Sequence, residues 1–223
     1  MDVSQFRRFG TLSLINVGRK HAEKLAAHPD GPIKNRSEAI VVLVNGLEQA
    51  YQARRPLRAL WVDATARKDA ADDALDAAIA ALSYDLLSPS HLNKNRAAPE
   101  YRAVFPDGNT NFINGPERAQ IAHVNGMVDY LRANPGHPMA GRAAELAEKN
   151  AALEAALAPQ AAAERAYRAA QEVERNAREA LFRGLRKSVT FLRGQFDGDE
   201  KRVEALYPTV AETKVKEEEG EET

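Results

Sequence analysis

Cysteine is absent from this chain of 223 residues, which excludes disulfides, thiolate metal sites and thiol nucleophiles. Aromatic residues make up only 6% of the sequence, and much of the apolar content is alanine. Small side chains fill narrow seams between helices better than they fill a thick globular core. The composition therefore favours a protein built from closely packed helices.

The chain also lacks an excess of charge of either sign. It carries 31 basic and 32 acidic residues, a formal net charge of −1, so no global field attracts it to nucleic acid or anionic lipid. The segment MDVSQFRRFG at the N-terminus has no apolar core typical of a signal peptide. No run approaches the roughly 18 apolar residues of a membrane-spanning helix. We expect a cytoplasmic protein that binds neither nucleic acid nor membrane.

Motifs typical of catalysis and cofactor binding are missing as well. The sequence has no HExxH, no Glu-x-x-His, no GxxxxGK[ST], no GxGxxG and no GxSxG. The five histidines show no ligand spacing: His21, His28, His91, His123 and His137. We therefore predict a protein that is not an enzyme and that holds no cofactor and no metal.

One segment resembles the opening of a calcium-binding loop. Residues 107–111 read Asp-Gly-Asn-Thr-Asn, which matches the alternating oxygen ligands of such a loop. Phe112 stands where the loop needs glycine, and Arg118 stands where it needs a bidentate glutamate. The favoured interpretation is a polar turn in which Asn114 caps the next helix.

Helical periodicity dominates the chain, and no alternating strand pattern is present. Apolar residues at three-four spacing, with proline and glycine at the breaks, predict helices over about 2–27, 35–87, 114–134 and 138–196. At 1.5 Å per residue, a helix of about fifty residues would be roughly 75 Å long. The predicted fold is all-α, an elongated antiparallel helical bundle or coiled coil.

The two halves of the chain look like copies of one plan. Residues 29–32 correspond to 135–138, Pro56 to Pro159, and residues 101–106 (YRAVFP) to 203–208 (VEALYP). This pattern predicts one helical domain, 1–211, made of two short-helix/long-helix repeats at about 1–110 and 111–211. Residues 212–223 are highly charged, and we expect them to form an acidic disordered tail.

The two interior prolines have two interpretations. Each removes a helical hydrogen bond at a cost of about 3 kcal/mol, so each predicts a kink in its long helix. Alternatively, each proline divides its helix into two. Small residues recur every seven positions along the second long helix, which predicts a close seam against the first: Ala156, Ala163, Ala170, Ala177 and Gly184.

Two groups of side chains are candidates for a partner surface. Arg54, Arg55 and Arg58 lie beside Trp61 near Pro56, and arginine and tryptophan are frequent at binding hot spots. The alternative is a solvated basic face with Trp61 in the seam. In the irregular stretch 88–115, Tyr101 and Phe105 belong either to such a surface or to a short helical turn that docks on a helix end.

The function predicted from these features is that of a non-enzymatic structural or protein-interaction protein, a scaffold or adaptor. Its partner would be another protein or a second copy of itself. The alternative is a bundle that binds a small molecule between its long helices, in a cavity lined by aromatic residues such as Trp61, Tyr51 and Tyr167. An enzyme is the least favoured class.

Overall fold

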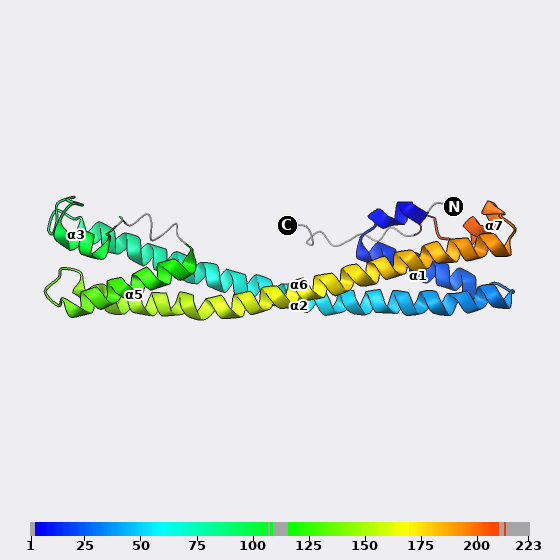
Figure 1. Ribbon diagram of the computed structural model, residues 1–223, viewed down its shortest axis with the longest axis horizontal. Coiled ribbons are helices and arrows are strands. Elements are labelled where there is room, and N and C mark those ends of the chain that lie inside the picture. Colours follow the sequence, from blue (N-terminus) through cyan, green and yellow to red (C-terminus); the bar gives the residue numbers. More distant parts are fainter. Residues whose placement is uncertain (1–2, 107, 109–115, 210–211, 213–223) are drawn as a thin grey trace. The chain divides into compact units, whose positions relative to one another are not determined.

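The computed structural model describes residues 3–106, 108, 116–209 and 212. Within these residues the regular structure is helical and no strand occurs, so the predicted all-α helical bundle is confirmed (Figure 1). The elements are η1 (Val3–Arg8), α1 (Thr11–Ala26), α2 (Gly31–Leu86), α3 (Pro99–Val104), α5 (Glu117–Ala133), η2 (Ala140–Arg142), α6 (Ala143–Gln195) and α7 (Glu200–Ala205).

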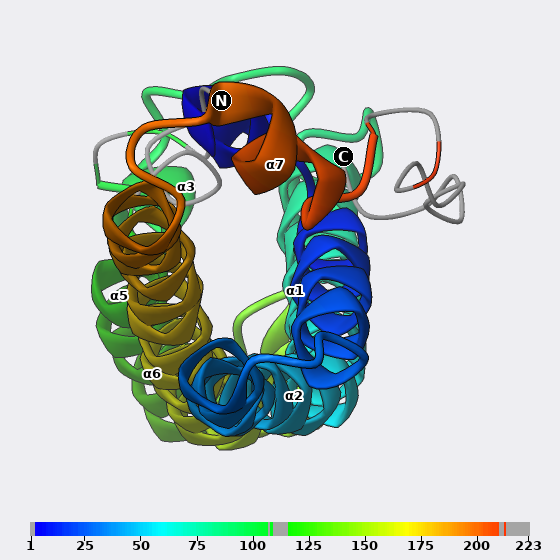
Figure 2. The ribbon, with the colours of Figure 1, turned by 90° about the vertical axis from the view of Figure 1, so that its right-hand side faces the viewer.

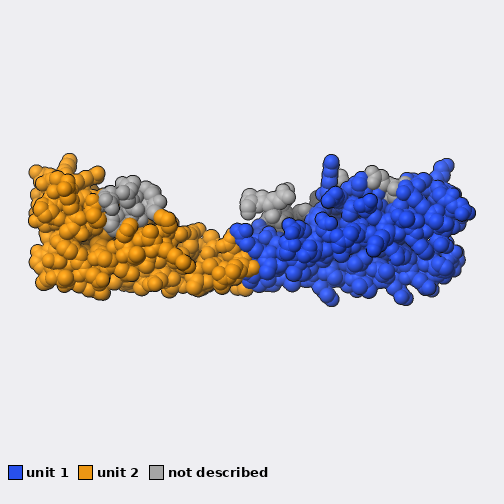
Figure 3. Space-filling model, in the orientation of Figure 1, with its two compact units in different colours: residues 1–58, 166–223 blue, residues 59–165 orange. Residues whose placement is uncertain are grey.

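The chain divides into two compact units (Figure 3). Unit 1 comprises residues 1–58 and 166–223, and unit 2 comprises residues 59–165. Each long helix, α2 and α6, therefore contributes one part to each unit. The compact units differ from the predicted repeats, because each unit combines a part of 1–110 with a part of 111–211.

In unit 1, α1 lies beside α2 (Figures 1 and 2). It also contacts α6, since a Cβ atom at Gly18 would meet Leu181. Only residues 27–30 separate α1 from α2, so the two helices run antiparallel. Thr11 contacts Glu174 and His21 contacts Ser188, so residue numbers rise together and α1 runs parallel to α6. The core of this unit contains Leu14, Val17, Leu25, Ile40, Val44, Leu47, Leu181, Leu185 and Leu192.

In unit 2, α5 occupies the corresponding place. Asn150 of α6 donates a hydrogen bond to the carbonyl of Ile121 at 3.1 Å, and Lys68 of α2 pairs with Glu117 at 3.0 Å. The core contains Leu75, Ile79, Leu82, Leu86, Val124, Val128, Leu131, Leu146 and Leu153. Both units thus combine one short helix with parts of α2 and α6, an arrangement that the duplicated plan would produce. The duplication itself stays a prediction.

The short helices α3 and α7 carry apolar residues into the two cores. Tyr101 and Phe105 are only 2% and 1% exposed in unit 2. Val203, Leu206 and Tyr207 are buried in the same way in unit 1. Asp199 caps α7 by accepting hydrogen bonds from the backbone N–H groups of residues 201 and 202. The prediction that these segments pack as short helical turns is confirmed.

Several predicted helix ends are wrong. The first predicted helix is two elements, because Gly10 is extended (φ −61°, ψ 166°) and separates η1 from α1. Helix α2 begins at Gly31 rather than near residue 35. The N–H of Lys34 already bonds to the carbonyl of Asp30, and Pro32 lies in the first turn, where its missing N–H is not needed.

The starts of the two later helices also differ from the prediction. Helix α5 begins at Glu117 after an extended Pro116, while the predicted cap Asn114 and the segment 109–112 lie outside the described residues. Pro138 is not the first residue of a long helix, because the 3-10 turn η2 follows it and α6 begins only at Ala143. The proline and glycine residues predicted where the helices are interrupted, but they did not predict the residue at which each helix begins.

Both long helices continue through their interior prolines, Pro56 in α2 and Pro159 in α6. The alternative that each proline divides its helix is therefore wrong. The side chains of both prolines are exposed, which avoids a clash with the core. A kink at each position stays a prediction.

Two glycines of unit 1 lie where helices approach closely. A Cβ atom at Gly18 of α1 would be closer to Val44 Cγ2 than the van der Waals contact distance of two carbons, and it would lie 3.3 Å from Leu181 Cδ1. A Cβ atom at Gly184 of α6 would meet Leu43 Cδ1 in the same way. The predicted small-residue seam is thus tight at Gly184, whereas Ala170 and Ala177 are half-buried.

These contacts predict different costs for two similar substitutions. Gly18→Ala should destabilise the protein by about 1–3 kcal/mol, because the branched Val44 side chain has little rotamer freedom to move aside. Gly184→Ala should cost less, because the tip of Leu43 can rotate away. Urea unfolding of both variants measures the difference.

Gly46→Ala is the matched control, since a Cβ atom there meets nothing within 4 Å and the site is inside α2. It should stabilise the protein by about 0.5–1 kcal/mol through helix propensity. Equal stability of Gly18→Ala and Gly46→Ala would contradict the close approach at Gly18.

Candidate functional site: a basic hollow on unit 1

The first predicted partner residue, Arg54, belongs to a buried polar cluster. Its Nε donates to the carboxylate of Glu174, and its Nη1 donates to the hydroxyl of Tyr167 at 3.3 Å. Burial alone would lower the pKa of Arg54, but Glu174 and Tyr167 outweigh burial and the pKa is raised. The Arg54 side chain is 13% exposed, so it stabilises the interior of unit 1 rather than an outer surface.

The other predicted partner residues differ in their exposure. Arg55 is exposed and Arg58 half-buried, while the half-buried Trp61 belongs to unit 2, since the units divide after Arg58. Tyr101 and Phe105 are buried in the core of unit 2, so their assignment to a partner surface is wrong. They were candidates because an irregular segment gives no sign of which side chains it buries.

Two aromatic residues of the alternative small-molecule cavity, Tyr51 and Tyr167, are buried in unit 1. Tyr51 and Tyr167 are 4% and 8% exposed. The Tyr167 hydroxyl accepts hydrogen bonds from Arg54 and from Gln171 Nε2, the latter at 3.0 Å. The Arg54 guanidinium lies 5.8 Å from the centre of the Tyr51 ring. Both rings therefore contact side chains of unit 1, and a ligand cavity beside them stays a prediction.

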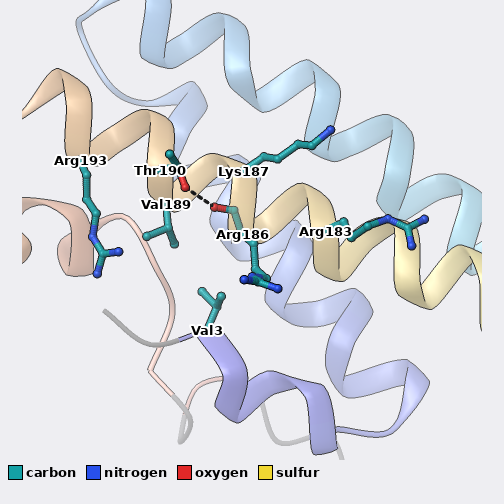
Figure 4. Close-up of a pocket in the computed structure, with 7 residues that line it drawn as sticks. All are labelled: Val3, Arg183, Arg186, Lys187, Val189, Thr190 and Arg193. Carbon is teal, nitrogen blue, oxygen red and sulfur yellow. Dashed lines mark hydrogen bonds between the residues drawn. The ribbon is translucent and has the colours of Figure 1, made fainter.

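A hollow of about 450 Å³ lies on unit 1 between α6 and η1 (Figure 4). Four of its residues are cationic, and its lining consists of Arg183, Arg186, Lys187, Val189, Thr190 and Arg193 of α6 with Val3 of η1. Figure 4 shows that Arg186 and Arg193 extend on the side of α6 where Val3 lies, whereas Lys187 extends to the other side. Between residues 180 and 195 the chain has four basic and no acidic residues.

Neighbouring carboxylates neutralise this charge only in part. Arg193 pairs with Glu200 at 2.6 Å, and Arg183 lies 3.7 Å from Glu179. The charged groups of Arg186 and Lys187, both exposed, form no ion pair within the described part of the chain. The hollow therefore offers Arg186 to an external anion on the side of Val3 and Val189, and Lys187 lies at its edge on the other side of α6.

A buried histidine holds α6 in place beneath the hollow. His21 is fully buried, with Nδ1 2.8 Å from the carbonyl oxygen of Leu206 and Nε2 2.8 Å from Ser188 Oγ. Its ring stacks on Tyr207 at 3.8 Å, and the Tyr207 hydroxyl donates to the carbonyl of Leu185 at 2.8 Å. Ser188 lies between Lys187 and Val189 in the sequence, so this contact fixes the part of α6 that lines the hollow.

The protonation state of His21 follows from these contacts. The carbonyl of Leu206 can only accept, so Nδ1 carries the proton and Nε2 of the neutral ring accepts from Ser188. Burial lowers the pKa of His21 from 6.5 to about 4, although the hydrogen bond to Leu206 opposes this shift. The histidine is therefore neutral in the folded protein near pH 7.

The sequence contained a signal for the hollow but none for its support. Residues 180–195 contain four basic residues and no acidic one, which the sequence shows directly. The net charge of −1, taken over the whole chain, does not reveal this local excess of positive charge. The pairing of His21 with Ser188 joins residues 167 positions apart, which no local pattern reveals.

This arrangement can bind an anion but offers little for catalysis. The hollow is lined by cations, one hydroxyl and apolar groups, and its lining includes no carboxylate or imidazole that could act as a general base. Among the described residues, no three His, Asp or Glu side chains cluster closely enough to hold a metal ion. No helix in the described part of the chain combines the length and apolar character needed to cross a membrane.

Comparisons with protein-family models, with curated proteins and with solved structures gave no match. The class that the fold defines is that of an all-α helical bundle, and the basic hollow is the feature from which a function can be argued.

The buried histidine predicts a specific dependence of stability on pH. Because the folded-state pKa of His21 lies below its unfolded value, the unfolded chain binds the extra proton between about pH 6.5 and 4. The contribution of His21 is complete above pH 6.5 and is lost as the pH falls toward 4, by about 3 kcal/mol at 1.36 kcal/mol per pKa unit. Urea unfolding from pH 7.5 to 4 measures this loss.

His21→Gln is the comparison, since it lacks the titrating ring. Its free energy of unfolding should be lower at pH 7.5 but should fall less steeply with decreasing pH. Parallel pH profiles for the variant and the unmodified protein would show that His21 is not held neutral by burial.

Proposed function

We propose that this protein is a non-enzymatic scaffold or adaptor that binds an acidic segment of a partner protein in the basic hollow of unit 1. The observation that carries this proposal is Arg186, an exposed cation on the Val3 side of the hollow that has no ion-pair partner in the described residues. Lys187, at the edge of the hollow, is exposed and lacks an ion-pair partner in the same way. The cytoplasmic location expected from the sequence is part of the same proposal.

The chemistry of the lining supports a carboxylate-rich peptide as the ligand. Arginine presents a planar fork of donors that matches a carboxylate with two parallel hydrogen bonds. Arg186 and Arg193 extend on one side of α6 (Figure 4), and Val3 and Val189 provide apolar contacts there. An acidic segment with one or two apolar residues would use both kinds of contact.

The charge distribution supports a protein partner over nucleic acid. Proteins that bind nucleic acid present an extended basic face, since every phosphate carries a charge. Here the cations of α6 lie close to Glu179 and Glu200, and the whole chain has a net charge of −1. A local basic hollow on a neutral protein suits a short acidic segment.

The proposal predicts the effect of removing the two cations. Arg186→Gln/Lys187→Gln should weaken binding of a fluorescein-labelled peptide that alternates glutamate with leucine. Two charge-assisted contacts of about 1 kcal/mol each correspond to a loss of about tenfold or more in affinity. Fluorescence anisotropy measures the affinity, which should also fall as salt rises from 50 to 300 mM, an outcome expected of exposed ion pairs.

The matched control is Arg102→Gln/Arg132→Gln, which removes two exposed cations from α3 and α5 of unit 2. It changes the net charge equally and should leave the affinity unchanged. A second peptide, with glutamine in place of glutamate, should bind weakly to every variant. Equal weakening by both double variants would reduce the effect to overall charge and refute a site at the hollow.

A further inference from the structure

A second hollow, of about 410 Å³, lies in unit 2 at the C-terminal end of α2. It is lined by Ala80, Ser83 and Tyr84 of the last turns of α2 and by Leu87, Ser88, Pro89, Lys94 and Arg96 of the segment that follows. The lining differs from that of the basic hollow, because an aromatic ring and aliphatic side chains are combined with two cations. Its volume is within the range typical of small-molecule sites.

The loop is held over the helix end by three backbone hydrogen bonds. Leu92 N–H donates to the carbonyl of Leu86, Asn93 N–H to that of Ser88 and Lys94 N–H to that of Leu87, at 3.2, 2.9 and 2.9 Å. The first bond satisfies the carbonyl of Leu86, one of those that a helix end leaves without a partner, and the other two close the turn that follows. The position of Lys94 and of the residues after it is therefore set by the backbone.

The backbone of this loop is strained at two consecutive residues. Asn93 and Lys94 have φ values of 45° and 64°, in the left-handed region that disfavours residues with a Cβ atom. Asparagine tolerates this region, but glycine is the residue that closes helix ends without strain. Lys94 is therefore unfavourable as a residue that closes a helix end. Strain of this kind is often found at functional sites, which suggests a role for the Lys94 side chain.

The side chains at this hollow are available to a ligand. Tyr84 is 79% exposed, although an aromatic ring is normally buried. Lys94 and Arg96 are exposed, and their charged groups form no ion pair within the described residues. The nearby carboxylate of Asp85 pairs with Arg142 at 2.9 Å, and the Ser83 hydroxyl with that of Tyr101 at 3.1 Å.

We infer that this hollow binds a small amphipathic organic anion, an aromatic ring that carries a carboxylate or sulfonate group. The ring would lie against Tyr84 and Leu87, and the anionic group would pair with Lys94 and Arg96. This site is independent of the proposed acidic-peptide site, because it lies in the other unit and depends on other residues.

The experiment uses the full chain and the probe 1-anilinonaphthalene-8-sulfonate, whose fluorescence rises when it leaves water. The neutral N-phenyl-1-naphthylamine, which has the same ring system, shows how much of the affinity depends on the charge. The sulfonate should bind with a single saturable site, and the neutral compound at least about fivefold more weakly, as expected when a charge-assisted contact is lost.

Lys94→Gly is the most informative variant, because it removes the cation and relieves the strain at once. It should melt at a higher temperature than the unmodified protein yet bind the sulfonate about fivefold more weakly. Arg96→Gln and Tyr84→Ala should weaken binding similarly. Lys187→Gln, at the basic hollow of unit 1, is the control and should bind the probe with unchanged affinity.

Three results would overturn the inference. One is unchanged sulfonate affinity in Lys94→Gly and Arg96→Gln; another is equal binding of the charged and neutral compounds. The third is loss of probe binding in Lys187→Gln, which would place the anion site on unit 1. Failure of the acidic peptide to bind would refute only the proposed function, since the peptide and the probe are tested on different variants.

Discussion

The close approach of α1 to both long helices at Gly18 is the constraint on which unit 1 depends. A Cβ atom there would overlap Val44 of α2 and press on Leu181 of α6, so only glycine allows this spacing. Interiors pack at crystal-like density, and one added methyl group is felt by its neighbours. The same spacing brings His21, one turn further along α1, within hydrogen-bonding distance of Ser188. The part of α6 that lines the basic hollow is therefore held by a contact that the close approach at Gly18 makes possible.

A buried carboxylate sets the register of the same helices. Glu174 is 6% exposed, accepts from the hydroxyl of Thr11 on α1, and pairs with Arg54 of α2. Arg178 adds a hydrogen bond to the carbonyl of Phe9 at 2.7 Å. Burying a charge costs several kcal/mol unless its partners are in place, so a packing of these helices that separated Glu174 from Arg54 would be unfavourable. Arg54, a candidate for partner binding in the sequence, has this internal role.

The two proposed sites share one physical feature, which is local cationic charge on a protein with almost no net charge. In unit 1 the charge lies on a regular helix, where residues three, four and seven apart share a face. In unit 2 it lies on a loop whose backbone is strained at Asn93 and Lys94. A regular helix suits an extended acidic segment, whereas a short fixed loop suits a compact ligand.

The sequence by itself determined that the chain is helical and where the helices break. Apolar spacing and the breaks at Pro29, Pro89 and Pro135 predicted the long helices to within a few residues at most ends, because helical hydrogen bonds and side-chain faces depend on residues three or four apart. The sequence also predicted the packing of Tyr207 through the repeated aromatic-Pro segment. It marked Tyr101 and Phe105 both as packing residues and as surface residues, and could not choose between them.

Only the tertiary structure decided which distant residues meet. Arg54 pairs with Glu174, and His21 forms a hydrogen bond with Ser188. Val3 lines the hollow on α6. In each case the residues are more than a hundred positions apart in the sequence. The four basic residues of 180–195 can be read in the sequence, but which of them line the hollow and which pair with a carboxylate of α7 depended on the packing of η1 and α7. The left-handed backbone conformation of Lys94 could not be predicted from the sequence, since lysine rarely adopts it. Periodicity depends on residues that are close in the sequence. A site, by contrast, needs side chains from different helices, and only the packing of those helices brings them together.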